Sequence, residues 1–198
     1  MRGPTGMSKR PGAHGPMAKA ELVGQFLVIW DFEEARNIYK LGFYGKPLGI
    51  SKPKSADFEA PLILDLLEGL YLLEKGIITV HEGPGGRQVG PKELRELGRK
   101  IHEGFDAKYA VYKDLRDAGL VVTSGIKFGC DFAVYRRGPG LEHAPFLVSV
   151  RKPEDTITAP DIVRAGRLAT TVRKRFVLAL VDERTKAVRY LMFKWFRA

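Results

Sequence analysis

The fold is decided by residues 109–174, and above all by one segment inside them, Phe128-Gly129-Cys130-Asp131-Phe132-Ala133-Val134-Tyr135. Successive side chains of a strand point to opposite faces, so Phe132 and Val134 share one face while Ala133 and Tyr135 share the other. The first pair is the more apolar and is predicted to face the core. Tyr135 then lies on the less apolar face, directly before a Gly/Pro turn, where its hydroxyl can reach a ligand.

The elements on either side of this segment predict a compact α/β domain. In chain order we expect a helix at 106–118, strands at 120–123 and 126–137 joined at Ser124-Gly125, a strand at 146–150, a helix at 158–174, and strands at 176–181 and 188–196. The strand at 146–150 is apolar throughout, which is typical of the centre of a sheet covered on both sides. Thr158 and Asp161 have the spacing of a helix capping box.

The N-terminal part predicts a smaller α/β unit without visible chemistry. Residues 1–19 are rich in Gly, Pro and basic residues and are expected to form a disordered basic tail. In chain order we then expect a strand at 22–30, a helix capped by Asp31, a mobile basic loop at 40–54, a helix at 61–75, a strand at 77–80 and a helix at 91–105.

Charge and cysteine content limit the classes of function. The chain of 198 residues has 33 Lys+Arg against 23 Asp+Glu and a pI near 9.7, which favours an anionic partner, most commonly a polyphosphate backbone. A basic surface without a partner is the alternative. The single Cys130 excludes an intramolecular disulfide and a cysteine-based zinc cluster. No apolar run approaches the ~20 residues that span a bilayer. We therefore expect a soluble, cytoplasmic protein.

Two further residues could act with Tyr135. His143 lies in the loop at 138–145, whose turn reverses the chain and should bring it near Tyr135. An imidazole can donate a proton near neutral pH. Helical spacing from Asp161 onward would place four side chains on one cationic face, namely Arg164, Arg167, Thr171 and Lys174. An uninvolved surface histidine and a merely solvated cationic face are the alternatives.

A magnesium-dependent nuclease site is the competing interpretation of these residues. Such a site needs one acid and then, on the next strand, an acid two residues before a lysine. Asp131 could be the first acid, but Val150 stands where the second carboxylate is needed in Ser149-Val150-Arg151-Lys152. The sequence therefore favours a reaction without a metal or other cofactor.

Several motifs together resemble the catalytic domain of archaeal tRNA-splicing endonuclease. They are residues 112–120, 124–135, His143 and Val172-Arg173-Lys174. The resemblance covers residues 106–198 well and the N-terminal part loosely. It implies Tyr135 as general base, His143 as general acid and Lys174 as stabiliser of the transition state. It also implies a precursor tRNA folded into a bulge-helix-bulge and cut to leave a 2′,3′-cyclic phosphate and a 5′-hydroxyl.

The resemblance also implies contacts to RNA and to other subunits. Arg167 matches a position that grips a bulge base, and Arg189, Trp195 and Arg197 compete for a second such position on the last strand. Arg164 on the cationic helix face and Lys46 in the basic loop are further candidates for RNA contact. Asp182 and Glu183 match an acidic turn by which one subunit docks into another. Two bulges require two active sites and hence an even, symmetric assembly. The Gly/Lys loop around Lys46 resembles an insertion and favours a heterotetramer of two catalytic and two structural subunits, with a second endonuclease subunit as partner; a homotetramer is the alternative. A non-catalytic RNA-binding or architectural subunit is the alternative function.

The predicted fold class is α/β (α+β). We expect residues 1–19 to form the tail, residues 20–104 a small α/β domain, and residues 105–198 a restriction-endonuclease-like catalytic domain with a mixed central sheet flanked by helices.

Overall fold

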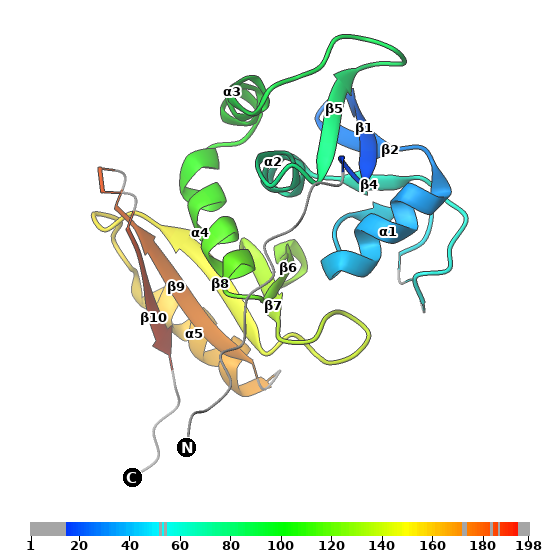
Figure 1. The fold of residues 1–198 in the computed structure, drawn as a ribbon. Helices are drawn as coiled ribbons and strands as arrows, with labels where there is room; N and C mark the ends of the chain where they lie inside the picture. The colour runs from blue at the N-terminus through cyan, green and yellow to red at the C-terminus, as the bar shows by residue number, and fades with distance from the viewer. Residues whose placement is uncertain are drawn as a thin grey trace, which may run out of the picture.

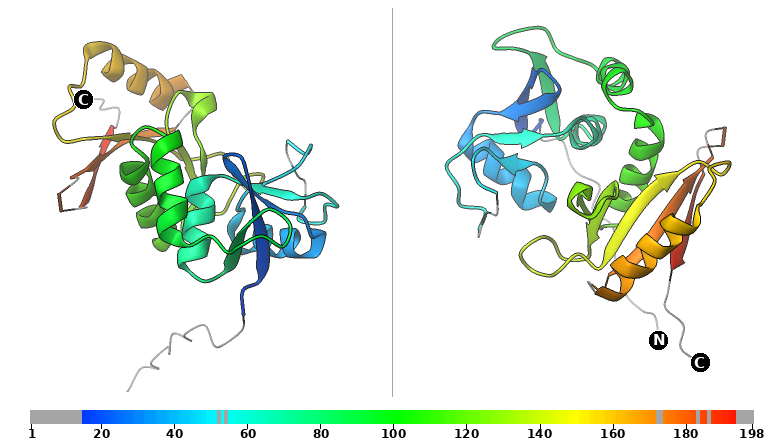
Figure 2. Two further views of the ribbon diagram at one scale, coloured as in Figure 1. Left: turned by 90° about the horizontal axis from the view of Figure 1, so that it is seen from above. Right: turned by 180° about the vertical axis from the view of Figure 1, so that it is seen from behind.

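The computed structural model describes residues 15–51, 53, 55–171, 174–182, 184, 185 and 187–193, with the backbone alone at 164, 165 and 168–171. Two five-stranded sheets lie at opposite ends, with helices between them and on the outer face of the second sheet (Figures 1 and 2). Among the described residues, no helix has the length and apolar character that crossing a membrane requires. Residues 18–101 are called the N-terminal half below, and residues 105–193 the C-terminal half.

The N-terminal half is built on a mixed sheet with the strand order β3-β4-β2-β1-β5. Its strands are β1 (Ala18–Val23), β2 (Phe26–Ile29), β3 (Lys46–Pro47), β4 (Leu62–Leu64) and β5 (Ile78–Glu82), and only β1 and β5 pair in parallel. Helix α1 (Phe32–Gly42) begins at the predicted cap, where the Asp31 carboxylate accepts the N–H of Glu34. Helix α2 (Leu66–Glu74) lies between this sheet and the C-terminal half (Figure 1).

Three predictions in this half were wrong. The expected single strand at 22–30 is a hairpin of β1 and β2, because Gly24 adopts a positive φ of 62° and turns the chain. The expected helix at 61–75 begins only at Leu66, because Asp65 and Glu68 form a reciprocal capping box there and the residues before it form β4. The segment at 40–54 was expected to be loop throughout, but it contains the short strand β3 and a buried Tyr44.

Two consecutive helices connect the halves. Helix α3 (Pro91–Ile101) ends earlier than predicted, and helix α4 (Phe105–Asp117) follows Gly104, which has a positive φ of 67°. Helix α4 packs on one face of the second sheet, whose strand order is β10-β9-β8-β7-β6.

The second sheet is mixed and flanked by helices, so the predicted fold class is confirmed. Its strands are β6 (Val121–Ser124), β7 (Phe132–Tyr135), β8 (Phe146–Arg151), β9 (Arg175–Val181) and β10 (Val188–Phe193). Only β8 and β9 are parallel, joined through helix α5 (Ala159–Thr171) on the face opposite α4 (Figure 2). The predicted strand at 126–137 is shorter, because the 3-10 turn Ile126–Phe128 and Gly129, with a φ of 67°, precede it.

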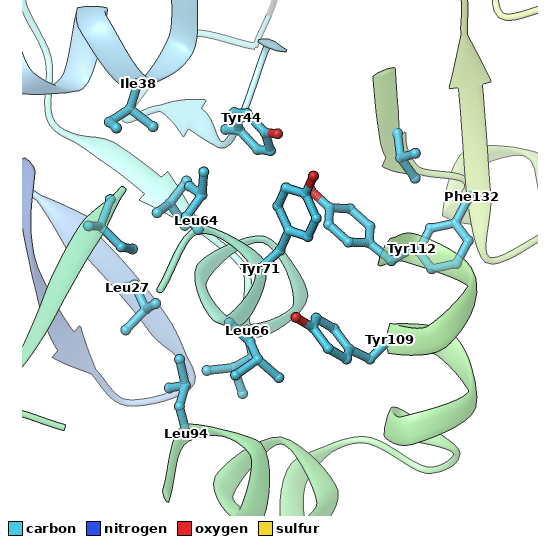
Figure 3. Close-up of a cluster of buried hydrophobic side chains, with 14 of the residues drawn as sticks. Leu27, Ile38, Tyr44, Leu64, Leu66, Tyr71, Leu94, Tyr109, Tyr112 and Phe132 are labelled. Atoms are coloured by element: carbon cyan, nitrogen blue, oxygen red, sulfur yellow. The ribbon is translucent and has the colours of Figure 1, made fainter. Parts of the chain in front are cut away.

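One hydrophobic core extends through both halves. A row of aromatic rings crosses the boundary, from Tyr44 through Tyr71 and Tyr112 to Phe132 on β7 (Figure 3). The successive ring centroids are 6.2, 5.8 and 6.1 Å apart, which are ordinary distances for interacting aromatic pairs. The position of the N-terminal half relative to the second sheet is therefore fixed by packing.

Gly98 on α3 allows the ring of Phe105 to approach the helix. A Cβ atom at this position would lie 2.4 Å from Cζ of Phe105, a ring that is 2% exposed. Overpacking costs about 1–3 kcal/mol, which exceeds the gain of about 1 kcal/mol from alanine in a helix. We expect Gly98→Ala to lower the thermal unfolding midpoint. Gly166→Ala on α5, where no atom lies within 4 Å of the Cβ position, should raise it. A rise with Gly98→Ala would contradict this packing.

Candidate active site

A pocket with a cavity volume of about 730 Å³ lies between the two halves. Its lining from the C-terminal half includes Lys127, Phe128, Tyr135, Glu142, His143 and Lys174, and its lining from the N-terminal half includes Tyr39, Phe43, Gly45, Lys46 and Pro47. The three residues predicted to act together, distant in the sequence, thus line one pocket.

Tyr135 is placed by the alternation of strand β7. Phe132 and Val134 point into the main core beneath α4, as predicted. Ala133 belongs to a second, smaller cluster on the opposite face, and Tyr135 packs against that cluster while remaining half-buried. The phenol is therefore held at the carboxyl end of β7 with access to the pocket.

His143 follows in the loop between β7 and β8, and it is exposed to solvent. Glu142 organises this loop, because its carboxylate accepts the backbone N–H groups of Arg136 and Arg137 at 2.6 and 2.5 Å. These hydrogen bonds, that of Arg137 first, lower the pKa of the Glu142 carboxyl. Glu142 was not among the residues predicted from the sequence, although an acid next to a candidate catalytic histidine is a usable signal.

Lys174 reaches the pocket from the residues before β9. Its Nζ donates a hydrogen bond to the carbonyl oxygen of Ala144 at 2.8 Å and lies 4.9 Å from the ring centroid of Phe128. Burial lowers the pKa of the Lys174 ammonium group, because a desolvated cation loses its proton more readily. The next residue, Arg175, donates its N–H to the carbonyl of Pro145 at 2.9 Å. This pairing brings position 174 beside His143.

The predicted place of Lys174 on a helical face was wrong. In the described part of the chain, α5 ends at Thr171, and Lys174 lies outside any helix, directly before β9. The sheet pairing of β9 with β8, rather than helical spacing from Arg167, brings its ammonium group to the pocket. A run of basic residues after an apolar helical pattern cannot by itself reveal where the helix stops.

The other predicted contact residues are placed in part. Lys46 lines the pocket, whereas Arg167 is exposed on α5 outside that lining. Asp182 accepts the N–H groups of Arg184 and Thr185 at 2.8 and 3.0 Å and so shapes the turn after β9. The remaining predictions lie outside the described residues or side chains: Glu183, Trp195, Arg197 and the side chain of Arg164.

Asp131, the candidate first acid of a magnesium site, makes contacts that hold the sheet and α4 together. Its Oδ2 accepts the N–H of Val150 at 2.8 Å, and its Oδ1 lies 3.3 Å from Nζ of Lys108. Asp131, directly before β7, is thus joined to β8 through Oδ2 and to α4 through Oδ1.

Comparison with known proteins matches both halves to one family. Residues 105–190 match the family model described as tRNA intron endonuclease, catalytic C-terminal domain, and residues 18–95 match that of the N-terminal domain. A fold of two mixed sheets with this catalytic domain defines an endoribonuclease. The tRNA-splicing endonuclease of Hyperthermus butylicus is 51% identical over 179 residues, covering 90% of this chain and 98% of that protein. The chain belongs to the tRNA intron endonuclease family.

Further relatives extend over the same length. The tRNA-splicing endonuclease of Saccharolobus islandicus is 48% identical over 180 residues, and that of Saccharolobus solfataricus is 46% identical over 180 residues. Each match covers 90% of this chain and 98% of the relative. The similarity therefore includes the N-terminal half, which the resemblance of the motifs covered only loosely.

Proposed function

We propose that the protein cleaves precursor tRNA at bulge-helix-bulge splice sites by transesterification without a metal ion. The observation that carries this proposal is the convergence of Tyr135, His143 and Lys174 on one pocket. Relatives named tRNA-splicing endonuclease, about half identical over nearly their whole length, support the substrate class. Unpaired bulge nucleotides suit the reaction, because their backbone can reach an in-line geometry that a regular RNA helix does not allow.

Each of the three side chains has one role in the proposed reaction. The phenolate of Tyr135 accepts the proton of the ribose 2′-hydroxyl, and the 2′-oxygen attacks the adjacent phosphorus. The bond from phosphorus to the 5′-oxygen breaks as protonated His143 donates a proton to that oxygen. The Lys174 ammonium group stabilises the negative charge that gathers on the non-bridging oxygens. The products are a 2′,3′-cyclic phosphate and a 5′-hydroxyl.

The tyrosine is the demanding member of this set. A free phenol is ionised to only about 0.1% at neutral pH. Tyr135 and the Lys174 cation line the same pocket. General acid and base steps each contribute about 10²- to 10⁴-fold to a rate, so a poorly ionised base remains compatible with useful turnover.

Cleavage should continue in the presence of EDTA. A transcribed precursor tRNA with a bulge-helix-bulge, incubated with protein that has been dialysed against the chelator, should be cut at both splice sites at an unchanged rate. The measurement is gel electrophoresis of end-labelled RNA. Loss of cleavage that added magnesium restores would contradict the proposed mechanism.

The chemical nature of the new ends provides the control for this experiment. The 5′ fragment should resist periodate until the cyclic phosphate is removed, and the 3′ fragment should accept phosphate from a polynucleotide kinase without prior dephosphorylation. A 3′-hydroxyl with a 5′-phosphate would indicate another reaction. Binding of the precursor without any product, with or without a second subunit, would favour a non-catalytic role.

We further propose that the protein works in an assembly with two active sites, favouring a heterotetramer with a second endonuclease subunit over a homotetramer. Strand β10 supports a subunit interface, because it is the edge strand of its sheet and exposes Tyr190, Leu191 and Met192 by 41–49%. The Asp182 turn is the proposed docking element of this assembly. The mass in solution, measured with and without a co-expressed partner, distinguishes the two assemblies.

Lys46 and Arg167 are proposed to contact the RNA.

A further inference from the structure

Phe43 has an unusual backbone conformation beside the pocket. It follows the last residue of α1 with φ 56° and ψ 37°, in the left-handed region, and donates its N–H to the carbonyl of Tyr39 at 2.7 Å. It is the only non-glycine residue with a positive φ among those described. Bulky side chains rarely adopt this region, and such a conformation persists only where the surroundings determine it.

Arg116 of the C-terminal half fixes the residues on both sides of Phe43. Its guanidinium group donates to the carbonyl of Gly42 at 2.7 Å and to that of Val122 on β6 at 3.0 Å. The same group lies 4.1 Å from the ring centroid of Tyr44. Arg116 is 6% exposed, so these contacts are shielded from water. The Phe43 backbone is therefore tied to the catalytic sheet.

The ring of Phe43 lies against the start of the loop that carries His143. A Cβ atom at Gly138 would lie 2.3 Å from Cε2 of Phe43 and 2.7 Å from both neighbouring ring atoms, so the ring occupies the place of a side chain at 138. Gly138 in turn accepts the N–H groups of Leu141 and Glu142, each at 3.3 Å. The contact thus reaches the residue next to His143.

We propose that Phe43 is a positioning residue, through which the N-terminal half sets the place of the His143 loop in the catalytic pocket. The inference rests on the proposed function, since it assigns a consequence to the position of the general acid. His143 itself is exposed, so the place of its imidazole depends on where its loop lies. A misplacement of about 1 Å at a reacting group can lower a rate about 100-fold.

The test is single-turnover cleavage of the bulge-helix-bulge precursor by Phe43→Leu. We expect the rate to fall by about 10- to 100-fold while the dissociation constant for the RNA stays within about twofold of wild type. Phe43→Tyr keeps the aromatic ring and should cleave at close to the wild-type rate. Phe43→Met serves as a second ring-free variant with the same expected loss if the leucine variant does not fold.

Phe58→Leu is the matched control. Phe58 packs on Tyr39 at the same centroid distance of 5.4 Å as Phe43, is buried, and is absent from the pocket lining. This variant should cleave at the wild-type rate once it is shown to be folded. A similar loss in both variants, or an undiminished rate in Phe43→Leu, would overturn the inference.

A substrate with sulfur in place of the 5′-bridging oxygen separates positioning from general damage. A thiolate leaves without a proton, so this substrate does not need the general acid. Phe43→Leu and His143→Ala should both regain most of the wild-type rate on it. Failure of the sulfur substrate to rescue Phe43→Leu overturns the inference alone. Failure of the wild-type protein to cut the ordinary substrate instead overturns the proposed function.

Discussion

Replacing His143 with alanine should lower the rate of cleavage by about 10²- to 10⁴-fold, the usual contribution of a general acid. The 5′-oxygen would then leave as an alkoxide, which is a poor leaving group in water. The affinity for the precursor should change little, because the imidazole acts on the leaving oxygen only in the transition state. Single-turnover cleavage and a separate binding titration measure the two quantities.

His102→Ala is the control for this variant. His102 follows α3, is exposed, and stacks beside Phe105 at a centroid distance of 6.4 Å, outside the pocket lining. The control should cleave like wild type. Full activity of His143→Ala would leave the reaction without its proposed acid.

Local patterns in the sequence account for the parts of the site that a single element positions. The alternation in β7 places Tyr135 opposite Phe132 and Val134, because a strand leaves no other choice once its core face is known. The Thr158 and Asp161 capping interaction forms as predicted, with Oγ of Thr158 donating to the Asp161 carboxylate at 2.7 Å. Both arguments need only neighbouring residues.

The features of the site that were not predicted from the sequence depend on contacts between residues far apart in the chain. Lys174 reaches the pocket through the pairing of β9 with β8, and no helical spacing encodes that pairing. The contact of Phe43 with Gly138 joins residues far apart in the chain, and neither residue marks the other in the sequence. The hairpin at Gly24 was missed for a local reason, because one glycine between two apolar runs also fits a bulged continuous strand.

Replacing Lys174 with alanine should lower the cleavage rate by about 10²- to 10³-fold, the loss typical of removing one group that stabilises an oxyanion. The ammonium group is held by the carbonyl of Ala144 and the face of Phe128 before any substrate binds. A charge placed in advance stabilises the pentacoordinate phosphate without reorganisation during the reaction. The loss should appear in the chemical step of single-turnover cleavage, with RNA affinity reduced far less.

The pH dependence of Lys174→Arg tests the charge itself. Burial lowers the pKa of the Lys174 ammonium group, so the wild-type rate should fall with rising pH below the range where an ordinary lysine titrates. An arginine keeps its charge there, and its alkaline fall should move to higher pH even if its different shape lowers the maximum rate. Lys127→Ala removes an exposed cation from the same pocket and should leave both the rate and the alkaline fall nearly unchanged. Equal losses in Lys127→Ala and Lys174→Ala would mean that the pocket uses its total positive charge, rather than one ammonium group beside the reacting phosphate.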